Sequence, residues 1–393
     1  MLVKQKQKFV LFFLILLLVF AFGFWFGKSQ VVCPVCPPED VDFSLFWETW
    51  KTIEEKYVDR EKLNVQEMIY GAISGMIESL EDPYTVFFKP EEAKKFLEDV
   101  KGFFEGVGME IAVKGGQLQV VAPLEGTPAQ KAGLRPGDKI LKVDGKSTTD
   151  VTIDTAIDWI RGPKGTEVTL TVYREEWGQE RDVKITRGVI DIPSLKLEML
   201  AEDNIAYLRL YHFSEKASYD FREAAIEILA SPAQKIILDL RNNPGGYLDV
   251  AQDIAGWFLE KGQVVAIEDF GEGREQQEIL AEGNAKLLNY PVVILINEGS
   301  ASGSEILAGA LRDNREVKLI GETSFGKGSV QELTDLRGGF SLKITIAEWL
   351  TPKRESITDK GLEPDIKVEL SEEDYEEGRD PQLDKAIEVI KNL

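Results

Sequence analysis

Two stretches, Lys235-Ile-Ile-Leu-Asp-Leu-Arg-Asn-Asn-Pro-Gly-Gly246 and Pro291-Val-Val-Ile-Leu-Ile-Asn-Glu-Gly-Ser-Ala-Ser302, decide the fold of this chain. Each begins as an uninterrupted apolar run, typical of a strand buried on both faces, and ends in a glycine-rich turn. Helical patterns follow at 249–258 and 303–311. Such an alternation predicts an α/β domain whose sheet is covered by helices. Because ligands bind at the carboxyl ends of strands in such sheets, both turns are expected to belong to one site.

The second turn presents a candidate nucleophile, Ser302, at the entry to a helix. Backbone N–H groups are unsatisfied there and the helix dipole is positive, which favours an oxyanion beside the serine. We expect the N–H of Gly303 to be one donor and that of Gly245 or Gly246 to be the second, because glycine lets a substrate approach the backbone. The alternative is that the serines of this turn only cap the helix.

A candidate base follows in Gly326-Lys-Gly-Ser-Val-Gln331. To accept a proton near neutral pH, Lys327 needs a pKa that burial has lowered. Phe325, Val330 and Leu333 are expected to supply an apolar wall. Gln331 is expected to hold the amine if the glycines bend the backbone, since an extended strand would separate the two residues by roughly 13 Å. A phosphate-binding loop is disfavoured, because the glycine spacing that precedes the lysine in such loops is missing.

The amino-acid composition excludes most other mechanisms of hydrolysis. The only histidine is His212, and the only cysteines are Cys33 and Cys36, far from both turns. A thiol peptidase and a zinc site built from several His or Cys are excluded in the body of the chain, and a Ser-His-Asp triad would have to use His212. A serine–lysine pair without metal or cofactor is the simplest covalent mechanism left.

The length and the net charge of the chain limit the number of domains and the kinds of binding partner. A chain of 393 residues predicts two or three domains. Its net charge of −22 argues against a nucleic-acid partner, which needs a basic surface. Nothing in the composition decides whether the chain forms a homo-oligomer, so this remains open.

The N-terminal region predicts a membrane anchor. Residues 9–27 carry no charge, Lys4, Lys6 and Lys8 precede them, and Glu39 and Asp40 follow. About 20 apolar residues span a bilayer, and the positive-inside rule places 1–8 in the cytoplasm and the rest outside it. A cleaved signal peptide is the alternative, but no small-residue cleavage site follows the apolar run. The cysteine pair in the linker 28–42 is interpreted as a non-catalytic tether.

Residues 43–98 read as helices, and residues 99–188 change to short strands and glycine-rich turns. Strands are predicted at 117–121, 139–143 and 167–173, a hairpin turn at Asp144-Gly145, and helices at 127–132 and 151–160. The run Gly126-Thr-Pro-Ala-Gln-Lys-Ala-Gly-Leu-Arg-Pro-Gly-Asp-Lys-Ile140 resembles a PDZ domain. Such domains bind a peptide C-terminus as an added strand.

The PDZ resemblance implies a set of residues for tail binding. The carboxylate would lie in a nest of N–H groups formed by Gly106, Val107, Gly108 and Met109, and the tail would pair along 109–113. A plain tight turn is the alternative for this loop. Arg161, which follows the second PDZ helix, is a candidate sensor of the bound tail, although a cation at a helix end is favourable by itself.

From about residue 43 to its end, the chain resembles the carboxy-terminal processing proteases, which are tail-specific serine peptidases with an internal PDZ domain. The resemblance rests on the motifs above together with Asp82-Pro-Tyr-Thr-Val-Phe87 and Gly361-Leu-Glu-Pro-Asp365. It implies Ser302 as nucleophile, Lys327 as general base and Gln331 as the residue that orients the lysine. The family's interval of 25 residues between serine and lysine is reproduced, which selects Ser302 over Ser300 and Ser304.

Two positions depart from the family pattern. Gly303 stands where alanine usually follows the nucleophile, and Lys353-Arg-Glu355 stands where a glycine is usual. The first leaves the backbone N–H in place, and the second affects a loop. His212 lies outside every motif and is interpreted as structural.

The predicted architecture is a multidomain α/β chain with a transmembrane anchor, a helical lead-in, a β-rich PDZ domain with two helices and a Clp/crotonase-like serine protease core. Its predicted divisions are 1–8 (cytoplasmic tail), 9–27 (anchor), 28–42 (linker), 43–98 (helical region), 99–188 (PDZ domain), 189–353 (catalytic core) and 354–393 (C-terminal region). The predicted function is cleavage of polypeptides near their C-termini by a single-pass membrane enzyme whose catalytic part is extracytoplasmic. A non-cleaving PDZ scaffold and an acyl-CoA enzyme of the crotonase type are the alternatives.

Overall fold

The computed structural model describes residues 16–20, 22 and 41–393, apart from 115, 125, 150, 192, 201–203 and 272. The chain divides into two compact units, Met1–Ala72 and Ile73–Leu393. Helix α2 (Ser44–Lys56) lies in the first unit, and α3 (Val65–Glu78) begins there. The predicted anchor and its cysteine-containing linker fall almost entirely outside the described residues. Among the residues that are described, no helix is long and apolar enough to cross a bilayer.

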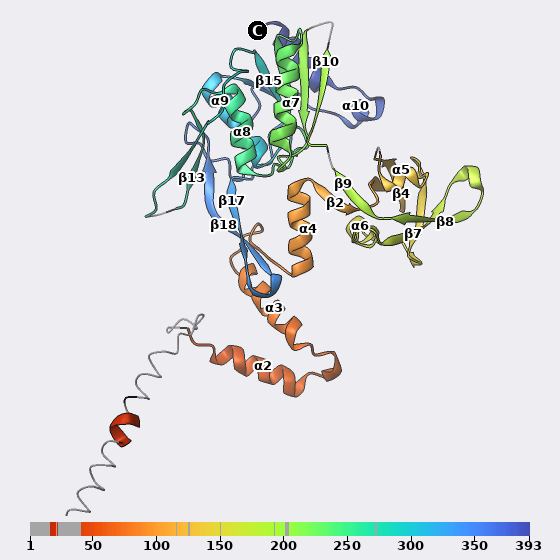
Figure 1. Ribbon diagram of the computed structural model, residues 1–393, viewed down its shortest axis with the longest axis vertical. Helices are drawn as coiled ribbons and strands as arrows, with labels where there is room; N and C mark the ends of the chain where they lie inside the picture. The colour runs from red at the N-terminus through yellow and green to blue at the C-terminus, as the bar shows by residue number, and fades with distance from the viewer. Residues whose placement is uncertain are drawn as a thin grey trace, which may run out of the picture. The chain divides into compact units, whose positions relative to one another are not determined.

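A six-stranded sheet forms the core of the second unit, in the order β10-β11-β12-β15-β16-β19 (Figure 1). All neighbours from β11 to β19 run parallel, and β10 is antiparallel to β11. The strands are β10 (Leu195–Leu200), β11 (Ile205–Leu210), β12 (Lys235–Asp239), β15 (Val292–Ile296), β16 (Lys318–Gly321) and β19 (Ile366–Lys367). The two apolar runs of the sequence are the neighbours β12 and β15, so their turns emerge at the same edge, as predicted.

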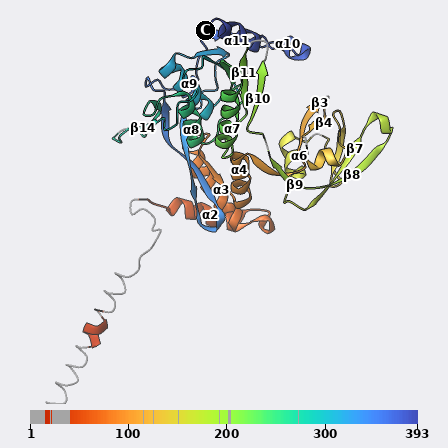
Figure 2. The same ribbon diagram turned by 45° about the horizontal axis from the view of Figure 1, so that its top comes forward.

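Both faces of this sheet are buried, which explains why its strands are apolar throughout. Ile236, Leu238 and Ile294 point into a large core with α7 (Ala217–Ala230), α8 (Leu248–Phe258) and α9 (Gly303–Arg315). Ile237 and Val293 point the other way, into a smaller core with α11 (Pro381–Lys391). Figure 2 shows α11 next to the C-terminus. The short α10 (Glu372–Glu377) precedes α11. The C-terminal region thus supplies both an edge strand and the helix that covers one face of the parallel sheet.

A second sheet of five strands contains the residues that follow the predicted base. Its strands are β1 (Val86–Phe88), β13 (Val264–Asp269), β14 (Gln277–Leu280), β17 (Ser329–Asp335) and β18 (Ser341–Leu350), with β18 pairing β1, β13 and β17. Strand β1 belongs to the region that the sequence predicts as helical. Its pattern is too short to be recognised, and its hydrogen-bond partner β18 lies far along the chain. Helix α4 (Pro90–Lys101) begins at the predicted proline.

The PDZ region folds as its own sheet, in the order β3-β4-β5-β7-β8, with β6 paired to β5. Its elements are β3 (Met109–Lys114), β4 (Gln117–Pro123), α5 (Pro128–Lys131), β5 (Lys139–Val143), β6 (Lys146–Ser147), α6 (Ile153–Ile160), β7 (Glu167–Tyr173) and β8 (Glu180–Thr186). Asp144 and Gly145 have positive φ, as the predicted hairpin turn requires. Strands β2 (Phe103–Gly106) and β9 (Gly188–Asp191) pair where the chain enters and leaves this domain.

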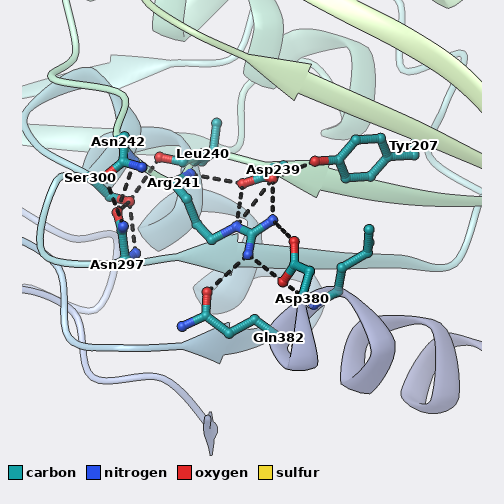
Figure 3. Close-up of polar contacts among 10 residues, drawn as sticks. Tyr207, Asp239, Leu240, Arg241, Asn242, Asn297, Ser300, Asp380 and Gln382 are labelled. Atoms are coloured by element: carbon teal, nitrogen blue, oxygen red, sulfur yellow. Dashed lines mark hydrogen bonds and ion pairs between the residues drawn. The ribbon is translucent and has the colours of Figure 1, made fainter. Parts of the chain in front are cut away.

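A buried ion-pair network ties α11 to the end of β12 (Figure 3). The Arg241 guanidinium donates hydrogen bonds to both carboxylate oxygens of Asp239, to both of Asp380 and to Gln382. Asp239 also accepts the hydroxyl of Tyr207 at 2.6 Å. Burial is the largest single influence and would raise the pKa of Asp380, but the hydrogen bonds from Arg241 and the Leu383 N–H, together with the charges of Arg241 and Arg209, hold the pKa below its usual value. The network therefore fixes Arg241, the first residue of the glycine-rich turn.

We predict that Asp380→Ala lowers the free energy of unfolding by about 1–3 kcal/mol. It removes a partner of a buried guanidinium and the carboxylate that accepts the Leu383 N–H at the start of α11. Asp384→Ala, in the same helical turn, is the matched control, because it removes only an exposed acid. Urea unfolding of both variants measures the difference. Equal stability of the two variants would contradict this role.

Candidate active site

Hydrogen bonds hold the turns after β12 and β15 together. The side chains of Asn242 and Asn297 bond at 2.9 Å, and the hydroxyl of Ser300 donates to Leu240 O at 2.8 Å (Figure 3). The carbonyl of Asn243 accepts both the Ala301 N–H at 3.0 Å and the Ser304 hydroxyl at 2.9 Å. Ser300 and Ser304 are fully buried, and both hydroxyls are committed to backbone carbonyls. These two serines fasten one turn to the other.

Ser302 differs from its neighbours in both conformation and exposure. It precedes α9 with φ 53° and ψ −114°, a backbone conformation that non-glycine residues rarely adopt. It is partly buried and lines a cavity of about 610 Å³. Strained residues at the start of a helix are typical of nucleophiles that a sharp turn presents to substrate.

The predicted oxyanion glycines lie beside this serine. A Cβ on Gly245 would lie 2.7 Å from Ser302 Cβ and 2.8 Å from Gly303 N, so only glycine fits there. The Gly245 N–H already donates to Asn243 Oδ1 at 2.9 Å. A Cβ on Gly303 would lie 3.6 Å from Gly246 N, which places those two N–H groups close together. Gly246 and Gly303 are therefore better placed than Gly245 to donate to one oxyanion.

Glu305 connects the serine turn to the loop that carries the lysine. Its carboxylate, 1% exposed, accepts the N–H of Ser302 at 2.8 Å and that of Lys327 at 3.0 Å on the same oxygen, Oε2. Its other oxygen accepts the Ser324 hydroxyl at 2.6 Å and the Gly326 N–H at 2.7 Å. Sequence reasoning missed this residue. The signal was present, because a serine followed three residues later by glutamate marks the start of a helix.

Lys327 lines the same cavity as Ser302, and its pKa is shifted in the direction that a base requires. Burial is the main cause that lowers its pKa, and the charge of Lys343 lowers it further, while Glu305 acts in the opposite direction. Its ammonium lies 5.3 Å from the centre of the Tyr84 ring. The loop is set by Gly326, where φ is +87° and a Cβ would lie 2.9 Å from Gly361 N. The Gly361-Leu-Glu-Pro-Asp365 motif thus supports the lysine loop.

Of the other residues predicted to surround Lys327, all but one line the cavity. Gln331, Val330 and Leu333 line the cavity, whereas the Phe325 side chain is 56% exposed and does not. Phe325 points away because its loop turns at Gly326 before β17 begins. The Gln331 amide donates to Ser329 Oγ at 2.7 Å, and a β-bulge separates Val330 from Gln331. His212, interpreted as structural, also lines this cavity.

The predicted tail-binding residues lie together in the PDZ domain. Gly108 has φ +77°, and its carbonyl accepts the Thr127 hydroxyl at 2.8 Å, while the carbonyl of Val107 accepts the Ala129 N–H. In the sheet as described, β3 is an edge strand starting at Met109. The Arg161 guanidinium lies 4.3 Å from the Phe104 ring centre, and its Cγ would be 3.6 Å from a Cβ on Gly106. These contacts place Arg161 beside the loop formed by residues 106–109.

Comparisons with known proteins agree on one family. Residues 204–368 match Peptidase family S41, residues 119–174 match the PDZ domain, and residues 38–92 match the activating protease CtpB N-terminal domain. The chain is 37% identical to carboxy-terminal processing protease CtpA of Bacillus subtilis, over 84% of this chain and 70% of that protein. It is 42% identical to the carboxy-terminal-processing protease of Bartonella bacilliformis, over 77% of this chain and 70% of that one.

Solved structures show the same relationship. The photosystem II D1 C-terminal processing protease is 27% identical, with a TM-score of 0.52 over 83% of this chain and 92% of that one. A putative S41 protease from Bacteroides fragilis, 16% identical over 91% of this chain and 99% of that one, has a TM-score of 0.56 and shares the fold. The chain is therefore a serine-type peptidase of family S41 with a PDZ domain, and it belongs to the carboxy-terminal processing proteases.

Proposed function

We propose that this peptidase cleaves polypeptides near their C-termini with Ser302 as nucleophile and Lys327 as general base. The observation that carries the proposal is that Ser302 and Lys327 line one cavity and that a single carboxylate oxygen of Glu305 accepts both of their N–H groups. A non-cleaving PDZ scaffold is disfavoured because the reactive serine, the buried lysine and adjacent N–H donors are all present. The acyl-CoA alternative does not account for the PDZ domain.

The reaction follows from the charges and donors of the cavity. The neutral Lys327 amine removes the proton of Ser302 Oγ as that oxygen attacks the scissile carbonyl. The N–H groups of Gly303 and Gly246 stabilise the oxyanion of the tetrahedral intermediate. The Lys327 ammonium then protonates the leaving amine. Water attacks the acyl-enzyme as it gives a proton to the same lysine, which returns that proton to Ser302 Oγ when the product acid leaves. Gln331 is proposed to hold the amine during these transfers by accepting its N–H at the side-chain oxygen Oε1, while Nε2 donates to Ser329 Oγ.

Tail selection is assigned to the PDZ domain. The free edge of β3 is suited to pair with an extended tail, and the loop at 106–109 is suited to bind its carboxylate. Arg161 is proposed to respond to the bound carboxylate, supported by its position beside Gly106. We also propose that residues 9–27 anchor the enzyme with its catalytic part outside the cytoplasm. Recovery of the full chain in washed membranes, lost when residues 1–42 are deleted, tests the anchor.

We predict that Ser302→Ala abolishes peptide cleavage, by at least about a thousandfold, without changing thermal stability. Ser300→Ala and Ser304→Ala are the matched controls, because their buried hydroxyls bond to backbone carbonyls. They are expected to lower stability while still reacting with a serine-directed phosphonate. Labelling of the Ser302→Ala variant at wild-type rate would show that another residue is the nucleophile.

We predict that Lys327→Arg is as inactive as Lys327→Ala, because a guanidinium stays charged and cannot accept a proton. In the wild type, kcat/KM is expected to rise with pH through a pKa below that of an ordinary lysine, because the base is active in its neutral form above its pKa. The pH dependence of kcat/KM on one peptide measures this. A Lys327→Arg enzyme that keeps more than about a tenth of the wild-type rate would exclude this lysine as the base.

We predict that peptides with a free C-terminus are cleaved faster than the same peptides amidated there. Gly108→Ala is expected to remove that preference, because its Cβ would lie 2.6 Å from Thr127 at a φ of +77°. Gly116→Ala is the matched control, with φ +74° and open space around its Cβ. Competition between the two peptides in one reaction gives the ratio. An intact enzyme that cuts both equally would contradict tail recognition by this loop.

A further inference from the structure

The cavity contains a second lysine, Lys343, that the proposed chemistry does not use. It lines the cavity together with Ser302 and Lys327. On β18 it is paired with Leu333 of β17 and Val86 of β1, which places it inside the sheet and not at an edge. Leu333 lies two residues beyond Gln331, about 7 Å of extended backbone. Lys343 therefore lies on the same wall as the reacting groups, a short distance along it.

The surroundings of Lys343 are mainly aromatic. Its ammonium lies 5.1 Å from the ring centre of Phe96 and 5.7 Å from that of Phe88, and the two rings stack on one another. Burial lowers the pKa of Lys343, and Asp82 opposes that effect. Aromatic faces compensate only part of the hydration that a half-buried ammonium loses. A lysine in this position is thus suited to gain from an added anion.

Asp82 is the one carboxylate whose charge acts on this ammonium among the residues described, and it does so without an ion pair. Across the part of the chain that the structure describes, Lys343 makes no ion pair. The oxygens of Asp82 accept hydrogen bonds from the Tyr84 N–H at 2.9 Å and the Thr85 hydroxyl at 2.6 Å. Asp249 also lines the cavity, but it comes from the first turn of α8, beside the oxyanion glycines. The positive charge at Lys343 is left for a ligand.

We propose that Lys343 is a specificity-determining residue that binds a carboxylate of the polypeptide in the active-site cavity. The inference rests on the proposed function of that cavity and adds the substrate chemistry it selects. Much of the remaining wall near Lys343 is apolar, including Leu97, Val100 and Trp349. A carboxylate bound there gains charge-assisted hydrogen bonds that a neutral group cannot make. The carboxylate belongs either to an Asp or Glu side chain near the cleaved bond or to the C-terminus of the chain.

The test uses pairs of synthetic peptides that differ only in one carboxylate. In one set a single Glu is moved through the positions flanking the cleaved bond, and each peptide competes with its Gln counterpart. In the other set a free C-terminus competes with an amide. The wild type is expected to prefer the carboxylate at one position by about tenfold. Lys343→Met is expected to bring that ratio to about one, Lys343→Arg to retain it, and Lys343→Glu to reverse it in favour of the neutral peptide of the pair.

Measuring the ratio of the two cleavage rates in one reaction separates substrate preference from a general change in activity. Removing Lys343 also changes the pKa of Lys327, but that change alters the cleavage of both competing peptides equally. The exposed Lys286, converted to Met, is the control and should keep the wild-type ratio. Loss of the Glu preference in Lys343→Met assigns a side-chain carboxylate, and loss of the preference for a free C-terminus assigns the terminal one.

Two outcomes separate this inference from the proposed function. If the wild type cleaves peptides through Ser302 but Lys343→Met keeps every carboxylate preference, or if no such preference exists, the role of Lys343 is wrong while the function stands. If Ser302→Ala still cleaves, the proposed function is wrong. If Lys343→Arg retains the preference for the carboxylate, the loss of that preference in Lys343→Met is due to the missing charge and not to poor folding.

Discussion

The carboxylate of Glu305 is the interaction on which the rest of the site depends. It is buried, and it accepts four hydrogen bonds, from Ser302, Ser324, Gly326 and Lys327. A buried carboxylate is costly unless it is fully hydrogen-bonded, so these donors are held in one arrangement. Because the N–H groups of Ser302 and Lys327, the proposed nucleophile and base, share the oxygen Oε2, a movement of either loop disturbs both residues. The same charge opposes the lowering of the Lys327 pKa, so Glu305 acts on position and on protonation together.

The two sheets contribute different parts of the chemistry. The parallel sheet supplies the turns after β12 and β15, and with them Ser302 and the glycines proposed to bind the oxyanion. The second sheet supplies β17 and β18, which carry Gln331 and Lys343 on the wall of the cavity. The C-terminal region contacts the two sides of this site at two separate points. Asp380 holds Arg241 at the start of one turn, and the Gly361 loop packs on Gly326 beside the lysine.

Much of the fold was predictable because its signals are local. The apolar strands at 235–240 and 291–296, the helices after them and the PDZ strands follow from hydrophobic pattern and turn residues. Strand β1 and helix α11 owe their place in the fold to partners far along the chain, which a local pattern does not report. The same limit applies to the site: Ser302 and Lys327 stand in recognisable turns, whereas Glu305 and Lys343 acquire their roles only from what surrounds them. Phe325 was expected in the apolar wall, but the turn at Gly326 directs it outward.

The most direct test of this account is the pH dependence of Ser302 phosphonylation in Glu305→Gln compared with the wild type. Glutamine keeps the size of the side chain but removes its charge and one of its acceptor oxygens. The account predicts a plateau rate reduced by about tenfold or more, because Ser302 and Lys327 are no longer held together. It also predicts that the rate rises at a lower pH, because the charge that raises the pKa of Lys327 is gone. A Glu305→Gln enzyme with the wild-type rate and an unchanged pH profile would contradict the central role of this carboxylate.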